Sequence, residues 1–134
     1  MARILVAEDD PGVRVLVARA LGLEGHAVVV AEDGEAALET LVKDDGAFDL
    51  LLSDIRMPAM TGIELAHEAS ARFPDLTILL MTGYAEQRES AEELDAIIVG
   101  VVDKPFTVAE IRRAVATALR GAYTEWETVR SCCA

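Results

Sequence analysis

The sequence lacks the features that would anchor a chain in a membrane, cross-link it by disulfides or hold a structural zinc ion. Its two cysteines, Cys132 and Cys133, are adjacent, so they cannot form a disulfide framework across a fold. Two histidines without partner cysteines exclude the usual zinc spacings. The longest apolar stretches reach about seven residues, against the roughly 20 that a membrane-spanning helix needs, and no secretory signal opens the chain. We therefore expect a cytoplasmic protein without membrane insertion.

Basic residues are also scarce. Twelve Lys and Arg stand against 24 Asp and Glu, which gives a net charge of −12. The basic residues are scattered, which argues against a nucleic-acid partner, and no glycine-rich phosphate-binding motif is present. Hydrophobic residues make up 52% of the chain, with a mean hydropathy of +0.29, enough for a folded core. The 134 residues fit one domain, predicted over residues 1–121 and followed by a tail, 122–134, that is either a helical extension or disordered.

Short apolar runs alternate with segments of helical period along the chain. The strands are predicted at 4–7, 27–31, 48–53, 76–81 and 96–102. The helices are predicted at 11–25, 33–46, from 61 onward, 86–94 and 106–120. Asp10 is a plausible N-cap, and Thr61 and Thr107 each precede a Glu by three residues, which is typical of a capping box. Strands that are apolar on both faces indicate an α/β fold, a doubly wound five-stranded parallel sheet flanked by five helices.

Polar side chains follow four of the predicted strands. Glu8 and Asp9 come after the first strand, Asp54 after the third, Thr82 after the fourth and Lys104 after the fifth. In a doubly wound sheet these ends meet at one edge, where such folds bind their ligands. Crowded carboxylates repel one another unless a hard divalent cation such as Mg²⁺ lies among them. A carboxylate nucleophile, a metal and a cation together are what phosphoryl transfer needs.

These motifs carry a resemblance to a known family. The sequence resembles a bacterial two-component response regulator receiver domain over about residues 2–120. The matching segments are 4–10, Asp54 with Met57-Pro58 and Gly62, Thr82, and Lys104-Pro105-Phe106. The resemblance implies a flavodoxin-like sheet with strand order 2-1-3-4-5. It also implies a signalling protein of a phosphorelay, not a metabolic enzyme.

The resemblance implies a role for each site residue. Asp54 would be the phosphoacceptor, Thr82 would hydrogen-bond the phosphoryl group and Lys104 would pair with it after a cis peptide bond to Pro105. Mg²⁺ would be bound by four groups: the carboxylates of Asp9, Asp54 and Glu8, the last through water, and the backbone carbonyl of Arg56. The phosphoryl group would come from a histidine kinase or a histidine phosphotransfer protein. Output would pass to a protein bound on the face of the fourth helix, fifth strand and fifth helix.

A narrower resemblance is to the CpdR-type single-domain regulators of alphaproteobacteria. It rests on the segments 7–10, 62–66, 74–76 and 81–84. It implies a phosphotransfer protein downstream of a hybrid kinase, and output by binding a protease machine or its substrates. Because little chain follows residue 120, we expect a stand-alone receiver whose output is protein–protein contact.

Two departures from the family pattern have consequences. Val101 stands where many receivers carry an aromatic switch residue, and Tyr84 is a candidate substitute. Arg56 and Tyr84 are large residues that flank the path of a water attacking an aspartyl phosphate. We therefore predict slow autodephosphorylation.

Other interpretations remain open for the same residues. A Mg²⁺-dependent phosphatase with an Asp nucleophile would use a similar set, but it typically needs an Asp-x-Asp motif on the first strand and a cap domain, and both are missing from this sequence. A pseudo-receiver would be a constitutive binding module. Taken singly, Asp54 and Thr82 could be turn residues and Lys104 a surface lysine. His26 and His67 are expected to be ordinary surface or loop residues.

Overall fold

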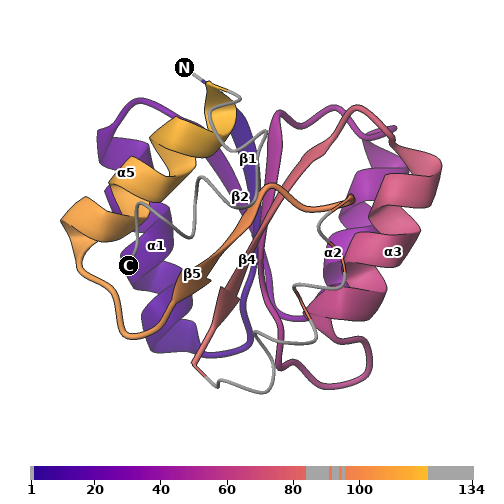
Figure 1. The fold of residues 1–134 in the computed structure, drawn as a ribbon, viewed down its shortest axis with the longest axis horizontal. Coiled ribbons are helices and arrows are strands. Elements are labelled where there is room, and N and C mark those ends of the chain that lie inside the picture. Colours follow the sequence, from indigo (N-terminus) through magenta and orange to yellow (C-terminus); the bar gives the residue numbers. More distant parts are fainter. Residues whose placement is uncertain (1, 84–90, 92–93, 95, 121–134) are drawn as a thin grey trace.

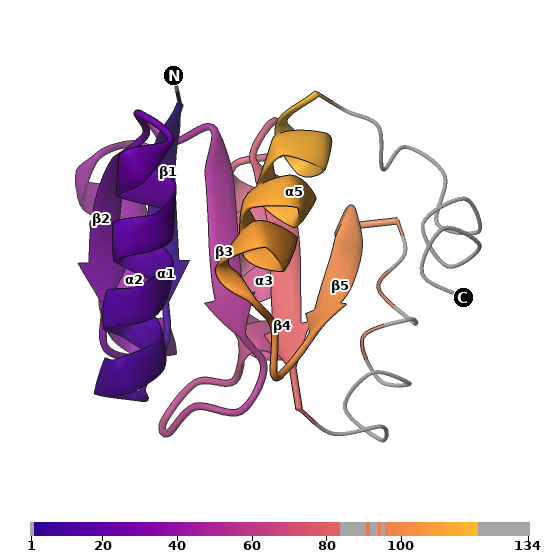
Figure 2. The same ribbon diagram turned by 90° about the vertical axis from the view of Figure 1, so that its left-hand side faces the viewer.

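A parallel sheet separates two layers of helices in the computed structural model, which describes residues 2–83, 91, 94 and 96–120. The strands are β1 (Arg3–Ala7), β2 (Ala27–Ala31), β3 (Leu50–Asp54), β4 (Thr77–Thr82) and β5 (Gly100–Asp103). The helices are α1 (Pro11–Leu23), α2 (Gly34–Lys43), α3 (Gly62–Arg72) and α5 (Val108–Leu119). Helices α1 and α5 cover one face of the sheet, and α2 and α3 cover the other (Figures 1 and 2).

The strand order is β2-β1-β3-β4-β5, and every pair is parallel. The predicted fold class and strand order are therefore confirmed. The described residues contain four helices, not five, because the helix predicted at 86–94 falls almost wholly outside them.

Alternate side chains of the central strands pack into two separate hydrophobic cores, one on each face of the sheet. Leu5 and Ala7 of β1 pack toward α2 and α3, whereas Ile4 and Val6 pack toward α1 and α5. All four are completely buried. This is why the strands read as continuous apolar runs without a polar face.

The helix starts follow the sequence signals. Thr61 and Thr107 each accept a backbone N–H bond, from Glu64 and Glu110, and both capping boxes are complete. The side chain of Asp10 accepts the backbone N–H groups of Gly12 and Val13, so it is the N-cap of α1, as predicted.

The fifth strand was predicted too long. It begins at Gly100, not at residue 96, because the backbone before it turns: the N–H groups of Ile97 and Ile98 both donate to the carbonyl of Leu94. Ile98 is nevertheless buried, at 3% exposed. A short apolar run cannot by itself distinguish a strand from a buried turn.

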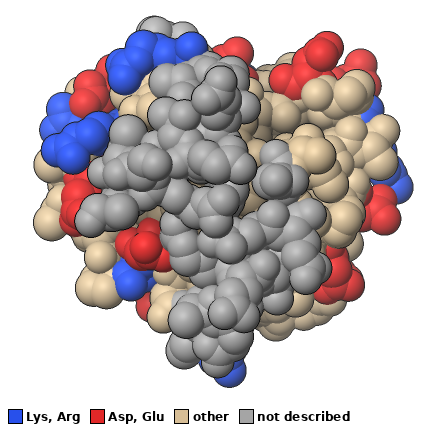
Figure 3. All heavy atoms as spheres, viewed as in Figure 1, with Lys and Arg blue, Asp and Glu red and all other residues tan. Residues whose placement is uncertain are grey.

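From the side shown in Figure 3, basic and acidic side chains of the described residues are interspersed. In the described part of the chain no helix combines the length and apolarity needed to cross a membrane. The predicted tail, 122–134, lies outside the described residues, so the predicted domain boundary stays a prediction.

Candidate functional site

Three carboxylates meet at the edge where the parallel strands end, at the bottom of Figures 1 and 2. Glu8 and Asp9 follow β1, and Asp54 is the last residue of β3, the strand beside it. One oxygen of each carboxylate lies within 4.8 Å of the others. Glu8 is 0% exposed and Asp54 6%, whereas Asp9 faces solvent. The predicted convergence of these residues is therefore what the structure shows.

Lys104 links two of the carboxylates. Its Nζ lies 2.8 Å from Oε2 of Glu8 and 3.3 Å from Oδ2 of Asp54. The residue follows β5 and precedes Pro105 through a cis peptide bond, as predicted. The ammonium of Lys104 therefore balances only part of the negative charge of the three carboxylates.

Burial controls the protonation of Glu8. Burial first, and then repulsion by Asp54, raises the pKa of Glu8 to about 7, against the lowering effect of the bond from Lys104. Burial by itself would lower the pKa of Lys104, but the bond to Glu8 and the charges of Asp54 and Glu8 outweigh it, so this pKa lies above its usual value. Lys104 therefore stays charged at neutral pH, whereas the carboxyl of Glu8 is partly protonated and partly ionised near pH 7.

Backbone contacts hold the loop after β1 in place. The N–H of Glu8 donates to the carbonyl of Ala31 at 3.1 Å, and Oε1 of Glu8 accepts the N–H of Asp10 at 3.1 Å. Nη1 of Arg14, in the first turns of α1, donates to the carbonyl of Glu8 at 3.0 Å. No sequence pattern indicates this contact of Arg14, since only the folded geometry brings its side chain back to the strand end.

Asp54 is fixed by a close approach between β3 and the start of α3. A side-chain carbon on Gly62 would overlap the carbonyl oxygen of Asp54, and it would lie 2.9 Å from the Cα of Ile55. The N–H of Ile55 donates to Oδ1 of Asp54 at 3.0 Å, which leaves Oδ2 toward Lys104. Gly62 is therefore required by the backbone geometry of the site.

Other predicted residues line a hollow at the carboxyl ends of the strands. This hollow is lined by Glu8, Asp9, Asp54, Arg56, Gly83 and Lys104, among others. Thr82 ends β4, is 1% exposed, and through its carbonyl accepts the N–H of Lys104 at 2.7 Å. The roles predicted for the carbonyl of Arg56 and the hydroxyl of Thr82 stay predictions.

Four further residues were discussed from the sequence. Val101 is a buried core residue, 5% exposed, and Tyr84 lies outside the described residues. His67 is exposed and His26 lies in the loop before β2, both as predicted; His26 is half-buried, and its Nδ1 accepts the N–H of Ala2 at 3.0 Å.

Comparison with known proteins agrees with this geometry. A sequence profile described as the response regulator receiver domain matches residues 4–116. The chain is 39% identical to the response regulator receiver protein CpdR of Brucella abortus over 111 residues, 83% of this chain and 91% of that protein. It is 36% identical to FleR of Pseudomonas aeruginosa over 105 residues, but these are 78% of this chain and only 22% of FleR.

A solved structure gives the same result. The response regulator TrrA of Thermotoga maritima, in complex with Mg²⁺-BeF, superposes with a TM-score of 0.78 at 34% identity, covering 88% of this chain and 99% of TrrA. The chain therefore belongs to the response regulator receiver domain family, the phosphorylation-dependent signalling domains of two-component systems.

Proposed function

We propose that this chain is a switch in which Asp54 accepts a phosphoryl group, with Mg²⁺, from a histidine kinase or a histidine phosphotransfer protein. The observation that supports this most directly is the meeting of Glu8, Asp9 and Asp54 within 4.8 Å, with the Nζ of Lys104 beside them. Membership of the receiver family supports the same function.

The carboxylates suit a small hard cation. Mg²⁺ takes oxygen ligands and is usually held by one or two carboxylates together with water and phosphate. Asp9 and Asp54 would bind it directly, Glu8 through water, and the carbonyl of Arg56 would add a ligand. When bound, the ion neutralises negative charge on the phosphoryl oxygens.

The remaining chemistry belongs to the side chains of this protein. An oxygen of Asp54 forms a bond to phosphorus while the bond between phosphorus and the donor's imidazole nitrogen breaks. That nitrogen keeps the electron pair, and the histidine leaves neutral when its other ring nitrogen carries a proton. The ammonium of Lys104, already 3.3 Å from Asp54, is placed to pair with the new phosphoryl group, and Thr82 would donate its hydroxyl. After phosphorylation, these contacts favour the conformation in which Thr82 and Lys104 close around the phosphoryl group.

Intact mass after incubation with acetyl phosphate and Mg²⁺ tests this proposal. We expect the gain of one phosphoryl group, with acetate released. Asp54→Asn and an excess of EDTA should each abolish the gain. If a phosphohistidine donor and acetyl phosphate both fail, the chain is a pseudo-receiver; multiple turnover of a phosphate ester would indicate an Asp-nucleophile phosphatase instead.

We propose that the aspartyl phosphate is long-lived. Arg56 lines the hollow beside Asp54, and we expect its large side chain to obstruct the approach of water. Arg56→Ala combined with Tyr84→Ala is expected to shorten the lifetime of the phosphorylated protein several-fold, measured by loss of the added mass after removal of acetyl phosphate. An unchanged lifetime in the double variant would contradict this.

Magnesium binding should depend on pH through Glu8. With a pKa of about 7, Glu8 is mostly protonated at pH 6 and mostly ionised at pH 8. The ionised form attracts a cation, so affinity should rise with pH through this window, by up to about tenfold per unit below pH 7. Calorimetric titration with MgCl₂ at pH 6, 7 and 8 measures this effect. In Glu8→Gln the rise should largely disappear, whereas an equal slope in both proteins would exclude Glu8 as its source.

Output is proposed to pass through a protein partner on the face that carries β5, α5 and the predicted helix at 86–94. Lys104 and Pro105 join β5 to α5 directly beside the carboxylates, so a change at Asp54 would reach this face first. The similarity to CpdR supports a signalling role through protein contact.

A further inference from the structure

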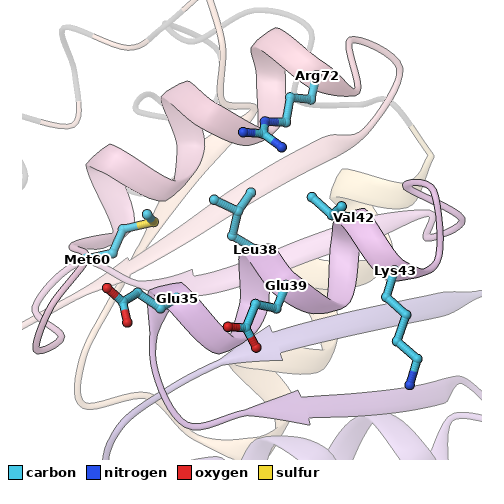
Figure 4. A pocket seen from close by; sticks show the side chains of 7 residues that line it. All are labelled: Glu35, Leu38, Glu39, Val42, Lys43, Met60 and Arg72. Carbon is cyan, nitrogen blue, oxygen red and sulfur yellow. The ribbon is translucent and has the colours of Figure 1, made fainter.

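A second surface feature lies away from the carboxylates, between α2 and α3 (Figure 4). Leu38 and Val42 of α2 point up toward α3, Met60 closes one end, and Arg72 reaches down from α3 at the other. We call this the α2–α3 groove. Its floor is apolar, and Val42 is 48% exposed although it is a large aliphatic residue.

The α2–α3 groove is formed by packing that leaves little freedom. Gly34 at the start of α2 lies so close to Met60 that a side-chain carbon there would overlap the Met60 carbonyl oxygen. Leu38 and Met60 also pack against the buried core beneath. A partner would therefore find this surface already shaped, which reduces the ordering cost of binding.

Charges of opposite sign lie at the two ends of the groove. Glu35 lies at the end near Met60, Glu39 lies about midway along the groove, and Lys43 and Arg72 lie toward the other end. Within the described part of the chain, Glu35, Glu39 and Lys43 have neither hydrogen-bond nor ion-pair partners through their side chains. Arg72 pairs with Glu68 at 3.5 Å, with both side chains 51% exposed. Such exposed pairs are worth little, so Arg72 can exchange its partner.

We propose that the α2–α3 groove is the contact surface for a second copy of this chain, related to the first by a two-fold axis. The occupant must present an apolar centre with a basic group toward Glu35 and acidic groups toward Lys43 and Arg72. Helix α2 of a second copy, running antiparallel to the first, presents this order of charges. A two-fold interface requires such self-complementarity, because the same patch faces itself in reverse.

The energetics indicate a weak pair. The four charges of the groove sum to zero, so the repulsion between the two copies comes mainly from the net charge of −12 that each copy carries. That net repulsion is largely screened beyond about 8 Å at physiological ionic strength. Small interfaces of this kind give transient complexes, and we expect dissociation in the range of about 10 μM to 1 mM.

Sedimentation of the full chain over this concentration range tests the proposal. The native chain should shift from monomer to dimer. Val42→Asp should remain monomeric, because it buries a charge at the centre of the contact. Val15→Asp is the matched control: Val15 lies on α1, is 55% exposed, and its replacement should leave the dimer unchanged. A monomeric native chain at 1 mM, or a dimer that Val42→Asp leaves intact, would overturn the proposal.

Charge exchange identifies the orientation. One variant carries Glu35→Lys, a second carries Lys43→Glu, and a third carries both changes. Each single variant should be monomeric, because the antiparallel contact then opposes groups of like sign at positions 35 and 43. The double variant should form the dimer again, since positions 35 and 43 of the two copies are then of opposite sign. It has the same net charge as the native chain, so a general effect of net charge cannot explain the rescue. A double variant that is folded but monomeric would exclude the antiparallel arrangement.

Discussion

Gly62→Ala is expected to destabilise the domain more than any other single methyl addition in the helices described. The added carbon would overlap the carbonyl oxygen of Asp54 and lie 2.9 Å from both the Asp54 carbonyl carbon and the Ile55 Cα. These are backbone atoms, which cannot rotate away as a side chain can. Overpacking usually costs 1–3 kcal/mol, and we expect about 3 kcal/mol here. For a domain of this size that corresponds to a Tm lowered by roughly 10 °C, measured by thermal unfolding.

Gly22→Ala provides the matched control. Gly22 lies in the last turn of α1, and a side-chain carbon there would meet nothing within 4 Å. Because alanine favours helix more than glycine does, this variant should gain about 0.5–1 kcal/mol. If both variants unfold at the same temperature as the native chain, the close approach of α3 to Asp54 is not a constraint on the fold. A loss in Gly62→Ala with a gain in Gly22→Ala would establish it.

Lys104→Met is expected to have the second large effect. The variant keeps the aliphatic stem but removes the ammonium group that lies within 4 Å of both Glu8 and Asp54. Loss of one partner from a buried ion pair typically costs 3–5 kcal/mol. We expect about 3 kcal/mol at pH 8, measured by urea unfolding in the absence of Mg²⁺. At pH 5 the cost should be much smaller, because Glu8, whose pKa is about 7, is then protonated in the folded protein.

The control for this variant is Lys43→Met. Lys43 is the only other lysine in the sequence, and it is exposed on α2. Its replacement should change the free energy of unfolding by no more than about 0.5 kcal/mol at either pH. Lys104→Met should also slow phosphorylation by acetyl phosphate by about 100-fold, since one charged donor to the phosphoryl group is lost. An equal unfolding energy for both variants at pH 8 would contradict the balance of charges proposed for the site.

The meeting of these carboxylates could be predicted from the sequence because it depends on topology. Once Asp54 and Glu8 are assigned to the ends of neighbouring parallel strands, the sheet brings them together whatever the details of packing. The capping boxes at Thr61 and Thr107 could also be predicted from the sequence, since their residues are close together in the chain.

Features that depend on tertiary contact could not be predicted from the sequence in this way. The bond from Arg14 to the Glu8 carbonyl and the overlap that requires Gly62 both need three-dimensional positions. The α2–α3 groove likewise arises from the approach of Gly34 to Met60, which no periodicity reveals. The start of β5 was misplaced for a related reason: Ile98 is buried in a turn, and burial alone does not specify an extended backbone.

The strand order has a consequence for how such a domain can diverge. The chain leaves β1 toward one helical layer, through α1, and leaves β3 toward the other, through α3 (Figure 1). The hollow at the end of these two strands forms because the backbone leaves them in opposite directions. The acidic residues inside the hollow do not produce it. Descendants that lose the phosphoacceptor would inherit the hollow intact. Its shape therefore depends less on individual side chains than its chemistry does, and new ligand specificities can arise there without a new fold.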